Sequence, residues 1–122
     1  MEKLKILVVD DEARMRKLVS DFLVRQNFEV LEAGDGAEAI DIFFADKEIA
    51  LVILDVMLPS EDGFSILKKL RRTPGAETLP AVMVTARTAE LDVVKGLDQG
   101  ADDYISKPFG VLEFVSRVKA VL

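Results

Sequence analysis

The chain has 122 residues, half of them hydrophobic and 31% charged, and its formal net charge is −6. This length suits one domain with its own hydrophobic core, and the negative charge disfavours binding to nucleic-acid phosphates. The chain contains no cysteine and no histidine, which excludes disulfides, thiolate metal sites and phosphohistidine chemistry on this chain. Because no apolar run approaches the roughly 18 to 20 residues that span a membrane, we expect a cytoplasmic domain over residues 1–122.

Short apolar runs alternate with longer amphipathic segments along the chain. The predicted strands are Lys5–Val9, Glu29–Ala33, Ala50–Asp55, Ala81–Thr85 and Asp103–Ile105. The predicted helices are Glu12–Arg25, Gly36–Ala45, Phe64–Arg71, Ala89–Gln99 and Val111–Val121. Because strands and helices alternate, the economical fold is α/β, with a parallel sheet and helices on both faces.

The first part of the chain already indicates strand positions. The run Ile6–Val9 is apolar on both sides of the pleat, as in a central parallel strand. In the following helix, one apolar face is predicted from residues at helical spacing: Met15, Leu18, Val19, Phe22 and Leu23. The strand Glu29–Ala33 alternates between polar and apolar residues, which predicts an edge position.

The later elements carry their own boundary signals. Asp35-Gly36 is typical of a helix N-cap, so the second helix should begin there. The run Leu51–Leu54 is apolar throughout and predicts a second central strand. Pro74-Gly75 then indicates the end of the third helix.

Polar residues gather where the predicted strands end. The first strand is followed by Asp10-Asp11-Glu12, and the third ends in Asp55. The fourth strand ends in Thr85, and the fifth is followed by Ser106-Lys107-Pro108. Open α/β sheets bind ligands beyond these carboxyl ends, where the strand order reverses. If the order is 2-1-3-4-5, the aspartates share one crevice.

Such a cluster of aspartates favours a bound cation. Two unit negative charges about 5 Å apart repel each other by roughly 3 kcal/mol at an effective dielectric of 20. A magnesium ion held by one or two carboxylates, a carbonyl and several waters suits this composition. Thr85 and Lys107 would add a hydroxyl donor and a positive charge. This set fits phosphoryl transfer to a carboxylate, which needs charge neutralisation and alignment.

Each of these residues also has a purely structural interpretation. Asp10 or Asp11 could cap the first helix, and Asp55 could be a turn residue at a strand end. Thr85 is a common strand residue, and Lys107 alone would be a solvated lysine. The agreement between the ends of four separate strands favours a shared functional site.

Longer motifs carry a resemblance to a known family. The stretches "ILVVDDE", "LVILDVMLPSEDG", "VMVTAR" and "GADDYISKPF" resemble the receiver domain of bacterial two-component response regulators. The resemblance covers about Lys3 to Leu122, and the order of the motifs makes it specific. It implies the flavodoxin-like (βα)5 fold, a three-layer α/β sandwich with a five-stranded parallel sheet in the order 2-1-3-4-5.

The resemblance also implies a chemistry. Asp55 would be the phosphoacceptor, which takes a phosphoryl group from the phosphohistidine of a sensor histidine kinase or a phosphotransfer protein. The cofactor would be Mg²⁺, with Mn²⁺ as an alternative. Asp11 and Asp55 would be direct ligands together with the backbone carbonyl of Met57, and Asp10 would act mostly through metal-bound water.

The same resemblance implies a switch. Thr85 and Lys107 match the pair that grips the phosphoryl oxygens, and Tyr104 matches the aromatic rotamer switch that turns inward on phosphorylation. The Lys107–Pro108 peptide would be cis. Phosphorylation would then change the face formed by the fourth helix, fifth strand and fifth helix, and so control an output, which we expect to be transcription.

The motifs resemble two classes of regulator, which differ in how they dimerise. "DVMLP" and "GADDY" look most like regulators whose receiver precedes a winged-helix DNA-binding domain, in which charged residues of that face pair across a homodimer. The candidates here are Lys95, Asp102, Asp103, Glu113, Arg117 and Lys119. However, Val93 stands where that class often has a basic residue, and "RRTPGAETLP" looks more like stand-alone receivers. The chain is either a single-domain regulator or part of a longer one.

Other classes fit the sequence less well. A phosphatase of the haloacid dehalogenase class needs an acid two residues after the nucleophile, where this chain has Met57. A flavin carrier needs a phosphate cradle after the first strand, where Asp10-Asp11-Glu12 would repel phosphate. A module that signals without phosphorylation would not need the acidic set and Lys107. We therefore predict a signalling domain, not a turnover enzyme, that loses its phosphoryl group slowly.

Overall fold

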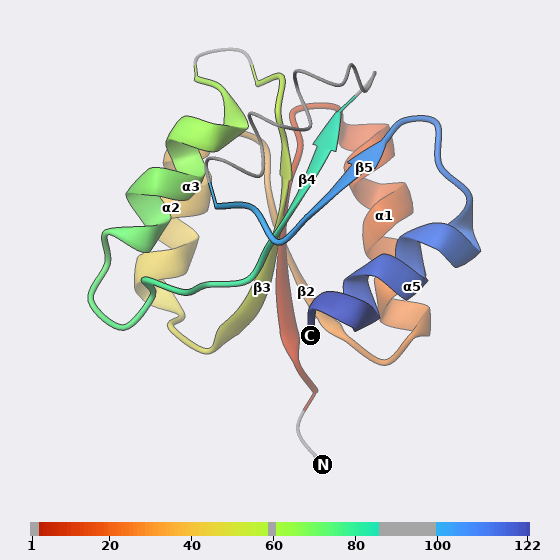
Figure 1. Cartoon of the computed structure of the whole chain (residues 1–122), viewed down its shortest axis with the longest axis horizontal. Coiled ribbons are helices and arrows are strands. Elements are labelled where there is room, and N and C mark those ends of the chain that lie inside the picture. Colours follow the sequence, from red (N-terminus) through yellow and green to blue (C-terminus); the bar gives the residue numbers. More distant parts are fainter. Residues whose placement is uncertain (1–2, 59–60, 86–99) are drawn as a thin grey trace.

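The computed structural model describes residues 3–58, 61–85 and 100–122 (Figure 1). Its elements are β1 (Lys5–Val9), α1 (Ala13–Arg25), β2 (Glu29–Ala33), α2 (Gly36–Ala45), β3 (Ile49–Asp55), α3 (Gly63–Arg71), β4 (Ala81–Thr85), β5 (Asp103–Ser106) and α5 (Val111–Val121). Each lies within one residue of its predicted bounds. The predicted helix Ala89–Gln99 lies outside the described residues.

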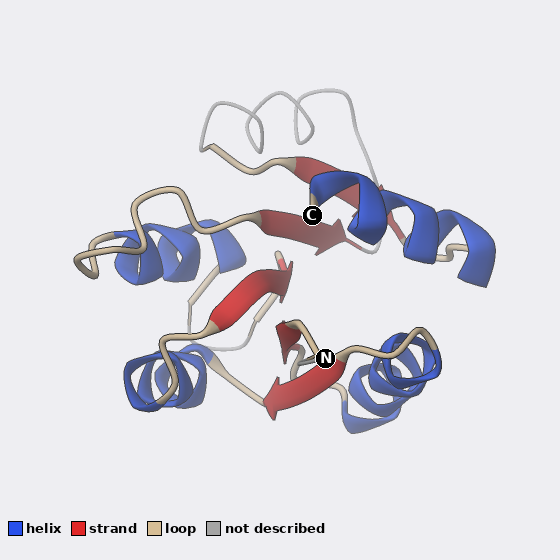
Figure 2. Cartoon of the chain, turned by 90° about the horizontal axis from the view of Figure 1, so that it is seen from below, coloured by secondary structure: helices blue, strands red, loops and turns tan. Residues whose placement is uncertain are grey.

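The strands form one parallel sheet in the order β2-β1-β3-β4-β5, which confirms the predicted fold class. The alternating strand β2 lies at an edge, and the apolar strands β1 and β3 lie inside the sheet, as predicted. Helices α1 and α5 cover one face, and α2 and α3 cover the other (Figures 1 and 2). Because the strands are parallel, all of them direct their carboxyl ends to the same edge of the sheet.

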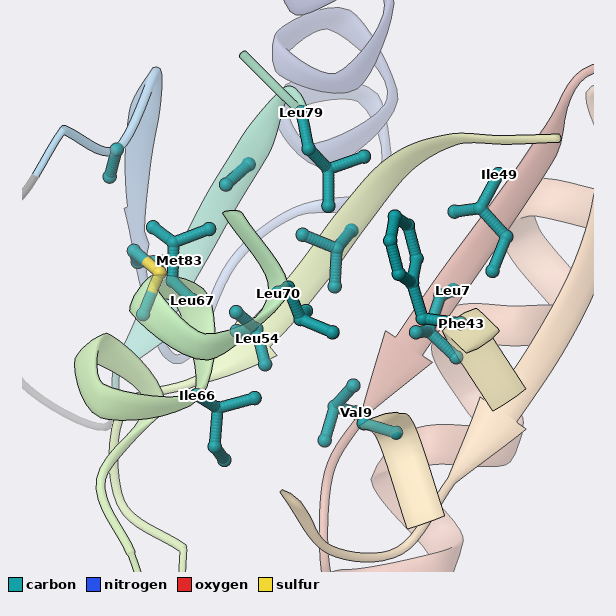
Figure 3. Packing of buried hydrophobic residues seen from close by; sticks show 14 of the residues in the cluster. Leu7, Val9, Phe43, Ile49, Leu54, Ile66, Leu67, Leu70, Leu79 and Met83 are labelled. Carbon is teal, nitrogen blue, oxygen red and sulfur yellow. The ribbon is translucent and has the colours of Figure 1, made fainter. Parts of the chain in front are cut away.

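Two apolar cores hold the layers together. Alternate residues of β1 enter different cores, because successive side chains of a strand point to opposite faces. Leu7 and Val9 pack in the core under α2 and α3, where Leu54, Leu67 and Met83 also lie (Figure 3). The other core, under α1 and α5, contains Ile6, Val8, Val19, Leu23, Ile53, Phe114 and Val118.

Helix α1 buries a narrower stripe than its sequence predicts. Val19 and Leu23 are buried, and Met15 and Phe22 are partly buried against the same core. Leu18 was predicted on this face, yet it is 45% exposed. One residue corresponds to about 100° of helical rotation, so Leu18 is turned well away from its buried neighbour Val19.

The helix boundaries follow local hydrogen bonds. The Asp35 side chain accepts a hydrogen bond from the Glu38 amide at 2.8 Å, which confirms the predicted N-cap of α2. Helix α3 begins in the same way, with Asp62 accepting from the Ser65 amide at 2.9 Å. It ends at Arg71, shortly before Gly75, which adopts a positive φ of 90°.

Gly63, the first residue of α3, allows a close approach of this helix to β3. Its amide donates to the Val56 carbonyl at 3.0 Å. A Cβ atom at position 63 would lie 2.4 Å from the Asp55 carbonyl oxygen, which is closer than real side chains come. Glycine therefore lets α3 begin directly beside the end of β3.

A membrane-spanning segment would need a long apolar helix. None of the helices in the described part of the chain meets this requirement.

Candidate functional site

An acidic cluster lies at the carboxyl edge of the sheet. Asp10 follows β1 and Asp55 ends β3, and these strands are neighbours. One carboxylate oxygen from each of Asp10, Asp11 and Asp55 lies within 4.8 Å of the others. Asp10 and Asp55 are only 5% and 6% exposed, whereas Asp11 is exposed. The topology thus brings these predicted residues together.

Lys107 reaches this cluster from beyond β5. Its Nζ atom lies 3.1 Å from Asp55 Oδ2 and 3.4 Å from Asp10 Oδ2. The Lys107 amide donates to the Thr85 carbonyl at 2.6 Å, which anchors this segment to the end of β4. The Lys107–Pro108 peptide is cis, in agreement with the prediction.

The charges of this site influence one another. Burial, together with the negative charge of Asp55, raises the pKa of Asp10, although the Glu12 amide and Lys107 act in the opposite direction. Burial would lower the pKa of Lys107, but its hydrogen bond and charge contact with Asp55, and then with Asp10, raise it overall. Lys107 is therefore a cation at neutral pH and neutralises part of the cluster's charge.

Main-chain groups orient the buried carboxylates. Asp55 Oδ1 accepts a hydrogen bond from the Met57 amide at 2.9 Å, so Asp55 Oδ2 is directed to Lys107. Asp10 Oδ1 likewise accepts from the Glu12 amide at 2.9 Å. Two carboxylates thus have fixed orientations before any ligand binds.

The Met57 side chain is 71% exposed and carries no group that transfers a proton.

The oxygen donors fit a hard divalent cation. Magnesium prefers oxygen ligands at 2.0–2.1 Å in octahedral geometry, so neighbouring ligands are about 3 Å apart and opposite ligands about 4 Å. The three carboxylate oxygens lie within 4.8 Å of one another. Contraction of the cluster, or one contact through water, accommodates Mg²⁺ among Asp10, Asp11 and Asp55.

Thr85 and Tyr104 lie on the neighbouring strands β4 and β5. Thr85 is buried at the end of β4, where it pairs in register with Ser106. Tyr104 pairs with Met83 and is buried as well. Both predicted switch residues therefore lie in the half of the sheet formed by β4 and β5, and Lys107 follows β5 directly.

The residues predicted for an output face do not all contact one another. Arg117 lies 3.0 Å from Asp103 and 3.5 Å from Glu113, so these three form one group. Asp102 instead accepts from the Ala81 amide and from Arg71.

The predicted output face also includes Lys119 and Lys95. Lys119 donates to Gln26 at 2.9 Å, which links α5 to the end of α1. Lys95 lies outside the described residues.

Two residues at the site were missed by reasoning from the sequence. Arg16 donates to the Asp10 carbonyl at 2.7 Å, and Gly63 permits the close approach to Asp55. A basic residue in the second turn of an amphipathic helix carries no local signal of such a contact. The glycine directly after the N-cap Asp62 was a weak signal, because glycine is uncommon inside helices.

Comparisons with known proteins extend over almost the entire chain. The family described as response regulator receiver domain matches residues 6–119. The chain belongs to this family. It is the receiver domain of a two-component response regulator, a family whose members are phosphorylated on an aspartate by sensor kinases and bind Mg²⁺ in an acidic pocket.

Curated relatives of this receiver domain include the transcriptional regulatory protein CpxR. The Escherichia coli (strain K12) protein is 45% identical over 118 residues, which cover 97% of this chain and 49% of the relative. The Klebsiella pneumoniae protein is 44% identical over the same shares. The receiver domain thus spans about half the length of the curated relatives it matches.

Solved structures share the fold of this receiver domain. The chemotaxis protein CheY4 of Vibrio cholerae superposes with a TM-score of 0.93 at 30% identity, covering 99% of this chain and 100% of that one. A putative response regulator from Chloroflexus aurantiacus J-10-fl superposes with a TM-score of 0.92 at 33% identity, covering 98% of each chain.

Proposed function

We propose that Asp55 is the phosphoacceptor of this receiver domain and that the donor is the phosphohistidine of a sensor histidine kinase or a phosphotransfer protein. One observation carries this proposal: Asp55 is grouped with an acidic pair, and one ammonium group contacts both Asp55 and Asp10. The Asp55 carboxylate is grouped with those of Asp10 and Asp11, and its Oδ2 atom lies 3.1 Å from Lys107 Nζ. These groups suit a reaction that needs alignment and charge neutralisation.

In the proposed transfer, an Asp55 carboxylate oxygen attacks phosphorus. The new O–P bond forms as the P–N bond of the phosphohistidine breaks, and the imidazole leaves with the electron pair. Thr85 and Lys107 donate to the transferred phosphoryl oxygens. The Met57 amide holds the second oxygen of the Asp55 carboxylate at 2.9 Å, so the nucleophile keeps its orientation.

Mg²⁺, or Mn²⁺ in its place, would neutralise charge on the carboxylates and on the phosphoryl oxygens. Asp11, Asp55 and the Met57 carbonyl would be its direct protein ligands. Asp10 would contribute through a metal-bound water, which agrees with the 4.8 Å spread of the carboxylate oxygens. The Met57 side chain cannot transfer a proton, so water would remove the phosphoryl group only slowly. The domain would signal and would not turn over substrate.

Phosphorylation would change the surface around β5 and α5. The phosphoryl group adds about −1.5 to −2 charges and strong acceptors. Thr85 would move toward these oxygens and vacate space into which Tyr104 would turn; Tyr104 is already buried in β5, so this turn would start from an inward position. The affected face would form a homodimer. We infer that the output is transcription, because the relatives named CpxR are transcriptional regulatory proteins. The candidate contacts of the dimer face are Lys95, Asp102, Asp103, Glu113, Arg117 and Lys119.

The proposed unit is one receiver domain over residues 1–122. The family match over residues 6–119 supports a single receiver domain across that stretch. We propose that it acts in the cytoplasm, as the resemblance to response regulators implies. Neither nucleic acid nor membrane would bind to the receiver directly, and the acidic net charge of −6 supports this for nucleic acid.

Mass spectrometry after incubation with acetyl phosphate and Mg²⁺ tests this proposal. We expect a mass increase that maps to Asp55 and that is absent from Asp55→Ala and from protein without a divalent cation. Asp41→Ala is the matched control, because Asp41 is an exposed aspartate on α2. Modification of another residue, or no modification of the wild type, would contradict the proposal.

The proposed role of Lys107 has a separate test. Lys107→Ala should still accept some phosphoryl group but should show a weaker conformational response, measured as dimerisation by analytical ultracentrifugation. If this variant dimerises like the wild type after phosphorylation, Lys107 is not part of the switch.

A further inference from the structure

The Arg16 side chain contacts the main chain of the loop after β1, which carries Asp10 and Asp11. Its Nη1 atom donates to the Asp10 carbonyl at 2.7 Å, and its Nε atom donates to Glu32 Oε1 at 3.2 Å. The side chain is 22% exposed, so most of it is packed against the protein. The guanidinium thereby ties the main chain of the acidic loop to β2.

This contact completes the restraints on Asp10. Its amide donates to the Ala33 carbonyl at 3.1 Å, and its carboxylate accepts from the Glu12 amide and from Lys107. The Asp10 carbonyl is held by Arg16. Each polar group of Asp10 thus has a defined partner.

The Asp10 carbonyl also determines the direction of the next residue. It belongs to the same planar peptide unit as the Asp11 amide, so holding this carbonyl holds the orientation of the whole unit. The Asp11 side chain is exposed, yet its carboxylate lies within 4.8 Å of those of Asp10 and Asp55. Its place in the cluster therefore depends on the main chain from which it projects.

We propose that Arg16 is a positioning residue for the acidic cluster: it holds the Asp10–Asp11 peptide so that both carboxylates face Asp55 before a divalent cation binds. This inference rests on the proposed function, in which these carboxylates hold Mg²⁺. Arg16 does not touch the cation or the reacting atoms. It acts through the main chain and lowers the reorganisation that binding requires.

Arginine suits this position better than lysine. Its planar guanidinium presents several N–H donors in a fixed fork, so it binds Asp10 and Glu32 together, whereas a lysine ammonium is a single point charge. Gly34 leaves room for the group, because a Cβ atom there would lie 3.3 Å from Arg16 Nη1. The surrounding residues thus accommodate a guanidinium.

The positive charge of Arg16 and its positioning contact have opposite effects on the affinity for Mg²⁺. Arg16 is a cation beside a cation site, so removing its charge alone would strengthen Mg²⁺ binding. Removing a positioning contact would weaken binding, because the loop would have to be ordered by the metal. The sign of the change therefore separates the two roles.

Isothermal titration calorimetry with Mg²⁺ tests the inference. Arg16→Met keeps an unbranched apolar stem but has no donor, and we expect its Kd for Mg²⁺ to rise about tenfold. Arg16→Lys should recover part of this loss. Arg14→Ala is the matched control, because it removes the same charge from an exposed position on the same helix. We expect its Kd to stay equal to the wild-type value or to fall.

Phosphorylation by acetyl phosphate supplies a second readout. For Arg16→Met, the Mg²⁺ concentration at half-maximal rate should rise about tenfold, while the rate at saturating Mg²⁺ stays close to that of the wild type. Urea denaturation without Mg²⁺ verifies that each variant is folded. Glu32→Gln, which keeps Arg16 and its bond to Asp10, supplies a milder variant with an expected smaller loss of affinity.

The outcomes separate this inference from the proposed function. If the wild type binds Mg²⁺ and is phosphorylated on Asp55, but Arg16→Met binds Mg²⁺ equally or more tightly, only the role of Arg16 is wrong. An equal loss in Arg14→Ala would also overturn it. If the wild type itself neither binds Mg²⁺ nor accepts a phosphoryl group, both proposals fall.

Discussion

The Nζ atom of Lys107 lies 3.1 Å from Asp55 Oδ2, although 52 residues separate the two along the chain. Lys107 follows β5 and Asp55 ends β3, so the contact spans the position of β4 between them. A cation from one end of the sheet thereby neutralises a carboxylate near its centre. Any divalent cation that approaches Asp55 meets this ammonium group on the same carboxylate.

The first prediction concerns this ammonium group. Lys107→Ala should lower the free energy of unfolding in metal-free buffer by about 1–3 kcal/mol, because two buried carboxylates lose their shared cation. Mg²⁺ should then stabilise the variant more than the wild type, since no ammonium competes for Asp55. Urea denaturation with and without Mg²⁺ measures both effects.

Lys68→Ala is the control for this prediction, because Lys68 is an exposed lysine on α3. It should be close to the wild type in both buffers. Equal stabilisation of Lys107→Ala and the wild type by Mg²⁺ would show that Lys107 and the cation do not compete.

The second prediction concerns the close approach of α3 to β3. Gly63→Ala places a Cβ atom 2.4 Å from the Asp55 carbonyl oxygen and 2.9 Å from Met83. We expect a loss of about 1–3 kcal/mol in the free energy of unfolding, despite the better helix propensity of alanine. Thermal and urea denaturation measure this loss. Gly110→Ser is the comparison, because position 110 has open space and serine is a favourable N-cap. Similar stabilities of the two variants would contradict the steric explanation.

The third prediction concerns Arg71, which joins three segments far from the acidic cluster. It donates to the Leu79 carbonyl, to the Gly100 carbonyl and to Asp102, so α3 is held to the chain around β4 and β5. Arg71→Ala should cost about 2–3 kcal/mol, because hydrogen bonds to charged groups are among the stronger ones.

Arg72→Ala is the matched control for Arg71, since the adjacent arginine is exposed. It should change the free energy of unfolding by less than about 0.5 kcal/mol. Hydrogen exchange should also show faster exchange at Asp102, whose amide donates to the Ala81 carbonyl, in Arg71→Ala alone. Equal effects of the two variants would rule out the specific clamp.

The fourth prediction concerns the pair formed by Lys5 and Asp46 at the opposite end of the sheet, with their charged groups 2.8 Å apart. The hydrogen bond from Lys5 lowers the pKa of Asp46 below its ordinary value of 3.8. The pair therefore stabilises the fold above pH 3.8, and this contribution disappears as the pH falls through the lowered pKa of Asp46.

The pKa of Lys5 is raised above 10.5 by the same bond, so the contribution also disappears as the pH rises through that raised pKa. The difference in unfolding free energy between the wild type and Asp46→Asn should thus be constant near neutral pH and shrink at both extremes. Asp41→Asn, which removes one carboxylate from an exposed position of α2, controls for the change in net charge. A constant difference down to pH values well below 3.8 would contradict the assigned pair.

Much of the fold was predictable from short-range patterns. The apolar runs of β1 and β3, the alternation of β2 and the N-cap Asp35 each depend on neighbouring residues, so the sequence predicted their bounds and their places in the sheet. The grouping of Asp10, Asp11 and Asp55 with Lys107 was predictable as well. Parallel strands direct their carboxyl ends to one edge, and polar residues at those ends must then meet.

The pairing of individual donors with acceptors could not be predicted from the sequence. Arg16 reaches the Asp10 carbonyl, and Arg71 reaches two carbonyls, through contacts that depend on how distant segments pack. Leu18 has the spacing of a core residue and is nevertheless exposed, because the width of the buried stripe depends on the partner surface. The elements and the grouping of polar residues at the edge of the sheet could be predicted, since both follow from local pattern and strand direction. The orientation of those side chains depends on the packed fold, because hydrogen bonds require positions accurate to a few tenths of an ångström.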